Sequence, residues 1–148
     1  MMASKNIIFT TDFSGISVAA LPWAIDMANM LSADLTCLYV VEEPQIYSSL
    51  DMGAVAIPTT NELVTSAETR MQSFVAEHFS NTPNATTGKV VVGHAATEIV
   101  NTANETGAAL IVMTTHGYSG VKHVLLGSTT EDVVRHAACP VLSVRGSA

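Results

Sequence analysis

Five short apolar runs recur along the chain, separated by stretches with a different periodicity. The runs cover 6–11, 35–41, 89–92, 109–113 and 140–145, and the one at 89–92 is the shortest. Most of them lack a regular alternation of apolar and polar residues, which is typical of strands buried on both faces. They therefore predict a parallel sheet that is covered by helices.

The stretches between the runs carry apolar residues at steps of three and four. Such stripes pass through 18–28, 63–78, 96–103 and 133–137, and each would place one apolar helix face on the sheet. Pro22 falls early in the first stripe, where its missing amide is least harmful. The alternation predicts one α/β domain over 1–148, an open doubly wound sheet of five parallel strands in the order 3-2-1-4-5 with helices on both faces. Ligands of such sheets bind beyond the carboxyl ends of the strands.

The charge balance argues against nucleic acid as a partner. Thirteen acidic residues against six basic ones give a formal net charge of −7. A protein that neutralises many phosphates needs the opposite balance. Residues 1–88 contain only Lys5 and Arg70 as bases, so the C-terminal part is less unfavourable for a single anionic ligand.

The chain shows no pattern that predicts secretion or membrane insertion. No apolar run approaches the roughly 20 residues that span a bilayer, and no secretory signal pattern is visible. Cys37 and Cys139 lie far apart in the sequence, and we expect unpaired thiols in a reducing compartment. These features predict a cytoplasmic protein.

The segment 113–130 carries the clearest chemical signal. It follows a predicted strand and opens a helix at about Ser128, and Gly117 and Gly120 permit a backbone that crowds a ligand. Gly127 and Ser128 would lie at the helix N-terminus, where free amides favour an anion such as phosphate. Hydroxyl donors would come from Ser128, Thr129 and Thr130. The alternative is a surface turn in which Ser128 caps the helix.

This segment resembles the nucleotide-binding motif of the universal stress protein family, Gly-x2-Gly-x9-Gly-(Ser/Thr). Gly117 and Gly127-Ser128 match its second and third parts, and 131–145 resembles the closing helix and strand of the family. The start of the chain, Ile7–Ser14, is similar to the first strand and acidic turn. Thr114 stands where the motif has its first glycine, and Thr10 stands where the family often has proline.

The resemblance implies a cofactor, site residues and a partner. ATP, with or without Mg²⁺, would bind at the carboxyl ends of the first and fourth strands, and a homodimer would form through the last strand, 140–145. Thr11 and Asp12 would lie at the adenine and ribose end. Val40 would offer backbone contacts to adenine, and Met113 and Thr114 would line the ribose. The phosphates would contact Gly117, Gly127, Ser128, Thr129 and Thr130. Two alternatives stay open: Asp12 as a cap of the first helix, and Val40 and Met113 as plain core residues.

The sequence predicts no catalytic group and no metal site. The five histidines match no compact zinc spacing, and the two cysteines form no Cys-x-x-Cys pair. A Walker-type phosphate loop and an esterase elbow are both absent from the sequence. We therefore expect a regulatory ATP-binding protein rather than an enzyme, and the long loop at 42–58 would be its lid. The alternatives are a dimeric interaction protein that binds no nucleotide, and a weak ATPase.

Overall fold

The sheet is five-stranded and parallel throughout. The computed structural model describes residues 5–43, 58–82, 84–116 and 126–146. The strand order is β3-β2-β1-β4-β5, and each neighbouring pair is parallel. The strands are β1 (Lys5–Thr10), β2 (Ala33–Val41), β3 (Thr86–Val92), β4 (Ala108–Thr114) and β5 (Val141–Val144). The predicted fold class and strand order are confirmed.

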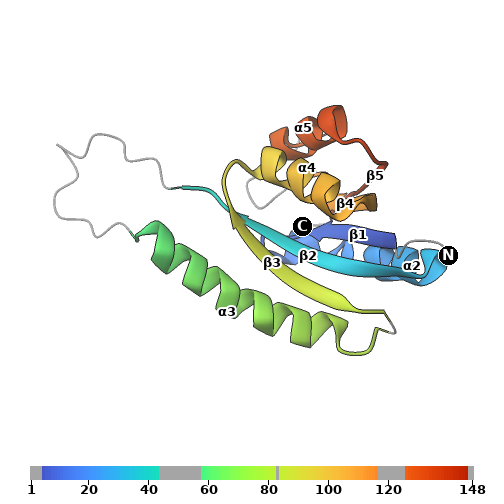
Figure 1. Cartoon of the computed structure of the whole chain (residues 1–148), viewed down its shortest axis with the longest axis horizontal. Helices are drawn as coiled ribbons and strands as arrows, with labels where there is room; N and C mark the ends of the chain where they lie inside the picture. Colours follow the sequence, from blue (N-terminus) through green and yellow to red (C-terminus); the bar gives the residue numbers. More distant parts are fainter. Residues whose placement is uncertain (1–4, 44–57, 83, 117–125, 147–148) are drawn as a thin grey trace.

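Helices cover both faces of the sheet. They are α1 (Gly15–Val18), α2 (Leu21–Leu31), α3 (Thr60–Phe79), α4 (Ala95–Thr106) and α5 (Ser128–His136). Helices α2 and α3 pack on one face and α4 and α5 on the other (Figure 1). None of the helices in the described ranges has both the length and the apolar content needed to cross a bilayer.

Each face of the sheet has its own hydrophobic cluster. On the α2–α3 side, the ring of Phe9 lies 6.4 Å from that of Phe74 and 6.1 Å from that of Phe79, measured between centroids. The next residue back, Ile8, points to the α4–α5 side and packs in a cluster with Ile111. Successive residues of β1 are therefore buried on opposite faces, as the absence of alternation in 6–11 predicts.

The third strand is present where it was predicted, but its predicted extent, 89–92, and its place as the shortest strand are wrong. Strand β3 has seven residues, and β5, with four, is the shortest strand. The first residues of β3, Thr86–Gly88, are polar or small, so an apolar run does not reveal them, but they pair with Leu35–Cys37 of β2. Gly88 lies against α3, and a Cβ added there would stand 2.5 Å from Cγ of Met71.

The first and last predicted helices also differ from expectation. The stripe at 18–28 is divided between α1 and α2, and Pro22 lies in the first turn of α2 as predicted. In α5, Val134 is 47% exposed, although the stripe at 133–137 assigned it to the buried face. Ala137 follows α5 as its C-terminal cap residue. Residues 44–57 of the expected lid lie outside the described residues.

Candidate functional site

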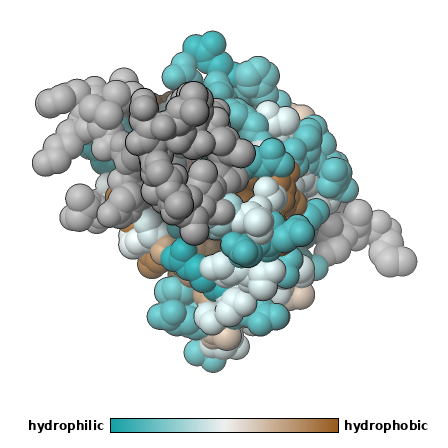
Figure 2. Space-filling view, turned by 90° about the vertical axis from the view of Figure 1, so that its left-hand side faces the viewer, coloured by the Kyte–Doolittle hydropathy of each residue, from teal (hydrophilic) through white to brown (hydrophobic). Residues whose placement is uncertain are grey.

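A cavity of about 170 Å³ opens at the carboxyl ends of β1, β2 and β4. The strand order reverses here, because β2 and β3 lie on one side of β1 and β4 and β5 lie on the other. Ligands of doubly wound sheets bind at such a point. The predicted site residues that line the cavity are Thr11, Asp12, Val40, Met113, Thr114, Thr129 and Thr130. Figure 2 turns this end of the sheet toward the viewer, and hydrophobic residues are visible there between hydrophilic ones.

The other predicted residues lie elsewhere. Gly127 and Ser128 do not line the cavity but occupy the start of α5, directly before two residues that do. Gly117 lies outside the described residues. The structure therefore brings seven of the ten predicted residues to one cavity and places two beside it.

The walls of the cavity divide into an apolar and a hydroxyl-bearing part. Leu38, Val40, Ile99 and Met113 supply the apolar part, and Leu38 and Met113 are buried. The hydroxyl groups come from the ends of β1 and β4, from Tyr39 of β2, from Ser17 of α1 and from the first turn of α5. Such a mixture of apolar surface and a few polar groups is usual for sites that bind small organic molecules.

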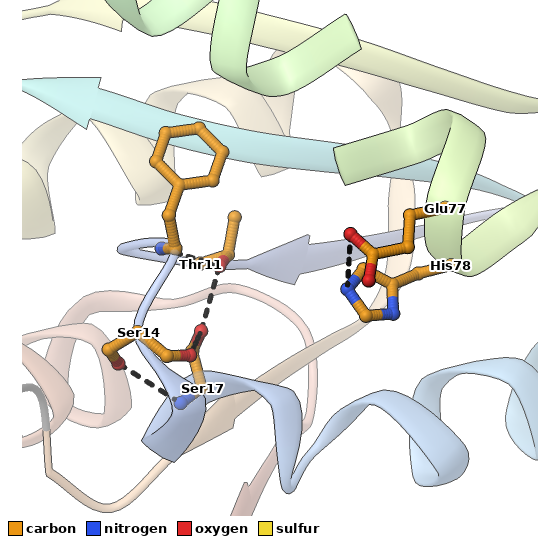
Figure 3. A network of polar contacts seen from close by, with 6 residues as sticks. Thr11, Ser14, Ser17, Glu77 and His78 are labelled. Atoms are coloured by element: carbon orange, nitrogen blue, oxygen red, sulfur yellow. Dashed lines mark hydrogen bonds and ion pairs between the residues drawn. The ribbon is translucent and has the colours of Figure 1, made fainter. Parts of the chain in front are cut away.

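The turn after β1 is held by buried hydroxyl groups (Figure 3). Ser17 Oγ donates to the carbonyl oxygen of Ser14 at 2.9 Å, so in the 2.8 Å contact between Thr11 Oγ1 and Ser17 Oγ the threonine must be the donor. Thr11 Oγ1 in turn accepts from the backbone amide of Phe13 at 2.9 Å. The hydrogen of the Thr11 hydroxyl is thereby committed to the turn, so this side chain shapes the site rather than donating to a ligand. The ion pair between Glu77 and His78, 3.9 Å, lies apart from this group.

Phe13 occupies the left-handed region of backbone space, with φ of 64°. A bulky L-residue pays roughly 1–2 kcal/mol for this conformation. The bond from its amide to Thr11 stabilises the turn, and its ring packs 4.6 Å from that of Tyr39. The strained residue directly follows Asp12, whose carboxylate is predicted to contact the ligand.

Asp12 is not the cap of the first helix. The N-cap of α1 is Ser14, whose hydroxyl accepts from the amide of Ser17 at 3.3 Å. Asp12 Oδ1 accepts from the amide of Ser14 at 2.9 Å and also from the Ser14 hydroxyl. Asp12 thus supports the cap residue, and it lines the cavity as well.

Hydrogen bonds join the end of β4 to the start of α5. Thr130 Oγ1, which is buried, donates to the carbonyl oxygen of Thr114 at 2.9 Å, and Thr114 Oγ1 donates to the carbonyl oxygen of His116 at 2.8 Å. The amide of Gly127 donates to the carbonyl oxygen of Thr115 at 2.7 Å, and a Cβ on Gly127 would stand 3.3 Å from that oxygen. A glycine at 127 is therefore explained by close backbone approach, and its φ of −66° is open to any residue.

The first turn of α5 offers backbone donors beside the cavity. An α-helix leaves the amides of its first turn without intrahelical acceptors. Gly127, the N-cap of α5, has no side chain that could bind them. Together with the helix dipole, these amides favour an anion at this end. Within the described ranges, histidine, cysteine, aspartate and glutamate form no group of three or more suited to a metal ion.

Sequence reasoning missed several residues of the site. Ser17, Tyr39, Ala95 and Ile99 line the cavity. Ser17 belongs to α1, and Ala95 and Ile99 belong to α4, two helices to which no site residue was assigned. Glu42 Oε1 accepts from the amide of Ala95 at 3.1 Å, which ties the end of β2 to the start of α4. The only local signal was the spacing of Ser14 and Ser17, three residues apart at a helix start.

The universal stress protein family model matches residues 3–145. The universal stress protein MJ0577 of Methanocaldococcus jannaschii is 28% identical over 95% of this chain and 94% of its own. YxiE of Bacillus subtilis, also a universal stress protein, is 30% identical over 95% of this chain and 99% of its own.

Solved structures agree with the sequence relatives. The structure of MJ0577 has a TM-score of 0.81 at 29% identity and covers 97% of both chains. A universal stress protein in complex with cAMP has a TM-score of 0.71 at 23% identity, covering 99% of this chain and 100% of that one. One from Archaeoglobus fulgidus in complex with dAMP has a TM-score of 0.67 at 17% identity, covering 98% and 100%. At these identities the last two show a shared fold alone.

Proposed function

Because the chain belongs to the universal stress protein family, we propose that it is a regulatory protein that binds an adenine nucleotide, with ATP as its ligand. The observation that supports this most directly is the convergence of seven predicted residues on the cavity at the ends of β1, β2 and β4. Relatives of the same fold that were solved with cAMP and dAMP add support for a nucleotide.

The two parts of the cavity wall match the two parts of a nucleotide. The apolar surface of Val40 and Met113 suits a planar base, and the Asp12 carboxylate can accept from ribose hydroxyl groups. The phosphates would meet the amides of the first turn of α5 at Ser128 and Thr129. Thr130 acts differently, because its proton is committed to Thr114, and it fixes α5 on β4.

The size of the cavity limits which part of ATP is enclosed. A volume of about 170 Å³ is below the roughly 300–1,000 Å³ of typical small-molecule sites. The base and ribose would be enclosed, and the phosphates would lie outward along α5. Mg²⁺ is usually held by few carboxylates together with substrate phosphates. It would therefore come with the phosphates rather than from a protein cage.

One observation favours a second function, that of an interaction protein without nucleotide. Thr114 lines the cavity where the motif of the family has glycine, so its side chain takes space that a ligand would use. A weak ATPase remains a third alternative. It would need a base near the phosphates, and His116, whose Nδ1 lies 3.0 Å from Thr115 Oγ1, is one described candidate.

Calorimetric titration of nucleotide-free protein with ATP tests the proposal. We expect saturable binding that weakens at least about tenfold, or about 1.4 kcal/mol, in Ser128→Asp, because the new carboxylate would face the phosphates. Thr69→Asp, an exposed change on α3, is the matched control and should leave the affinity unchanged. The absence of both heat and a thermal shift at millimolar ATP would favour the interaction protein.

The assembly and location are part of the same proposal. β5 lies at one edge of the sheet and pairs with β4 on its inner side. A second copy that pairs along 140–145 would cover this edge, which removes an aggregation hazard. One chain has a mass of 15.5 kDa, and light scattering should then give twice that mass. Both cysteines are free thiols, which supports a reducing compartment such as the cytoplasm.

A further inference from the structure

A second hollow of about 430 Å³ adjoins the nucleotide cavity. It lies between the end of β2 and α3, and we call it the α3 groove. Asp12, Tyr39, Val40 and Ala95 line both spaces, so they form a common wall. A ligand seated in the cavity would therefore lie directly beside the α3 groove.

The α3 groove begins at the strained turn. Phe13 lines it, and the ring is held between that of Tyr39, 4.6 Å away, and that of Phe74, 5.7 Å away. Backbone strain of this kind persists where surrounding contacts maintain it, and it clusters at ligand sites. Here the hydrogen bond that the backbone amide of Phe13 donates to Thr11 Oγ1 maintains it. Because the strained residue faces the α3 groove, the strain places an aromatic ring in that wall.

Arg70 of α3 lies over this ring. The carbon at the centre of its guanidinium group is 4.7 Å from the centroid of Phe13. The structure gives Arg70 no hydrogen bond or ion pair with any described residue, whereas Lys89 and Arg135 pair with Glu105 and Glu131. Arg70 is also the only basic side chain among the described residues that line either space. A guanidinium stacked on a ring can present its planar face and N–H groups to a further planar group.

The charges of the α3 groove decide what that further group is. The carboxylates of Asp12 and Glu42 also line it, so they outnumber the single guanidinium and disfavour a second phosphate. Apart from Ser66, the rest of the wall is apolar or aromatic and includes Phe13, Tyr39 and Leu63. An uncharged planar aromatic group satisfies both conditions. The phosphates would lie at α5, so such a group would be attached to the base or ribose.

Resting on the proposed nucleotide function, we propose that the α3 groove binds a second planar aromatic group carried at the base or ribose end of the adenine nucleotide. The group would stack on the guanidinium of Arg70, which Phe13 holds from below. The cavity would then bind the adenine nucleotide itself, and the α3 groove would select among nucleotides that differ in this aromatic substituent.

The test compares ATP with 2′(3′)-O-(N-methylanthraniloyl)-ATP, which carries an aromatic ester on the ribose. Calorimetry on the full chain should show the ester binding about 10-fold more tightly than ATP. Arg70→Met keeps the length of the side chain but removes the planar cation. It should reduce this preference to less than about 3-fold while the affinity for ATP changes by less than about 2-fold. Arg135→Met, an equivalent change on exposed α5 surface, should keep the full preference.

Each outcome decides the proposal. Equal affinities for the two nucleotides in the unmodified protein would overturn it and leave the nucleotide function intact. A preference that survives both Arg70→Met and Phe13→Leu would overturn it as well, because the ester would then bind elsewhere. Binding of neither nucleotide would overturn this proposal together with the function on which it rests.

Discussion

Replacing Thr11 with valine removes one hydroxyl group from the turn that carries Asp12. Valine has nearly the shape of threonine, so packing is kept while two hydrogen bonds are lost: the 2.9 Å bond from the Phe13 amide and the 2.8 Å bond to Ser17. Ser17 can still donate to Ser14, so the group left without a partner is the Phe13 amide. An unsatisfied, partly buried donor costs about 1–3 kcal/mol. We expect a loss of about 2 kcal/mol in the free energy of unfolding.

Thr11→Ser is the matched control, since it keeps the hydroxyl and removes one methyl group. Its expected cost is about 0.8 kcal/mol from lost apolar burial. Thermal unfolding at fixed protein concentration separates the two, because 2 kcal/mol corresponds to about 4–8 °C in a chain of this size. A valine variant as stable as the serine variant would refute the reasoning.

A double-mutant cycle with Ser17→Ala tests whether the two hydroxyl groups are coupled. Thr11 and Ser17 share one hydrogen bond, so the effects of the two changes on the free energy of unfolding should not be additive. We expect a coupling energy within the range of about 0.5–3 kcal/mol seen for residues in contact. Additive losses would show that the two hydroxyl groups act independently.

Three further changes test other parts of the structure. Gly93→Ala should lower the free energy of unfolding by about 2 kcal/mol, which thermal unfolding would measure. Gly93 has φ of 153°, and a Cβ there would stand 2.7 Å from Cγ of Glu98. Burial raises the pKa of the Cys37 thiol from 9.0 to about 12, so the folded state holds this proton more tightly. The stability of the unmodified protein relative to Cys37→Ala should therefore be constant below about pH 9 and fall by about 1.4 kcal/mol per pH unit above it, as pH-dependent urea unfolding would show. Glu42→Ala should cost about 1 kcal/mol by loss of the bond to Ala95, and Glu42→Gln less, because the amide oxygen still accepts; equal urea midpoints for the two variants would contradict this.

The sequence predicts the layers of this fold because its strands are buried on both faces. Ile7–Phe9 and Ile111–Met113 are buried without interruption, so they appear as apolar runs. Edge strand β3 has no such run at Thr86–Gly88, and its start depends on pairing with β2, a contact that only the folded chain makes. The boundary between α1 and α2 is likewise invisible in the apolar pattern, since the stripe continues across Ala19–Ala20.

The candidate site divides in the same way. Residues at strand ends, such as Thr11 and Met113, follow from the general position of ligands in doubly wound sheets. Contacts between distant segments do not: Arg70 lies over Phe13 and Ala95 binds Glu42, and in each pair the residues are more than fifty positions apart. Periodicity reports which face of an element is buried but not which partner it meets.

Thr114 illustrates how a departure from a motif can change a site without removing it. A glycine at this position would give a ligand more room, but it would also leave the turn at 114–116 freer, and ordering a glycine costs about 0.5–1 kcal/mol more than ordering alanine. Thr114 instead binds the carbonyl oxygen of His116, while the carbonyl oxygen of Thr115 in that turn accepts from Gly127. Fixing the turn therefore also fixes the first turn of α5, where the phosphates would bind. In the proposed nucleotide complex, the threonine would exchange space near the ribose for a more rigid set of amides, so the affinity for a nucleotide should depend more on the phosphates than on the nucleoside.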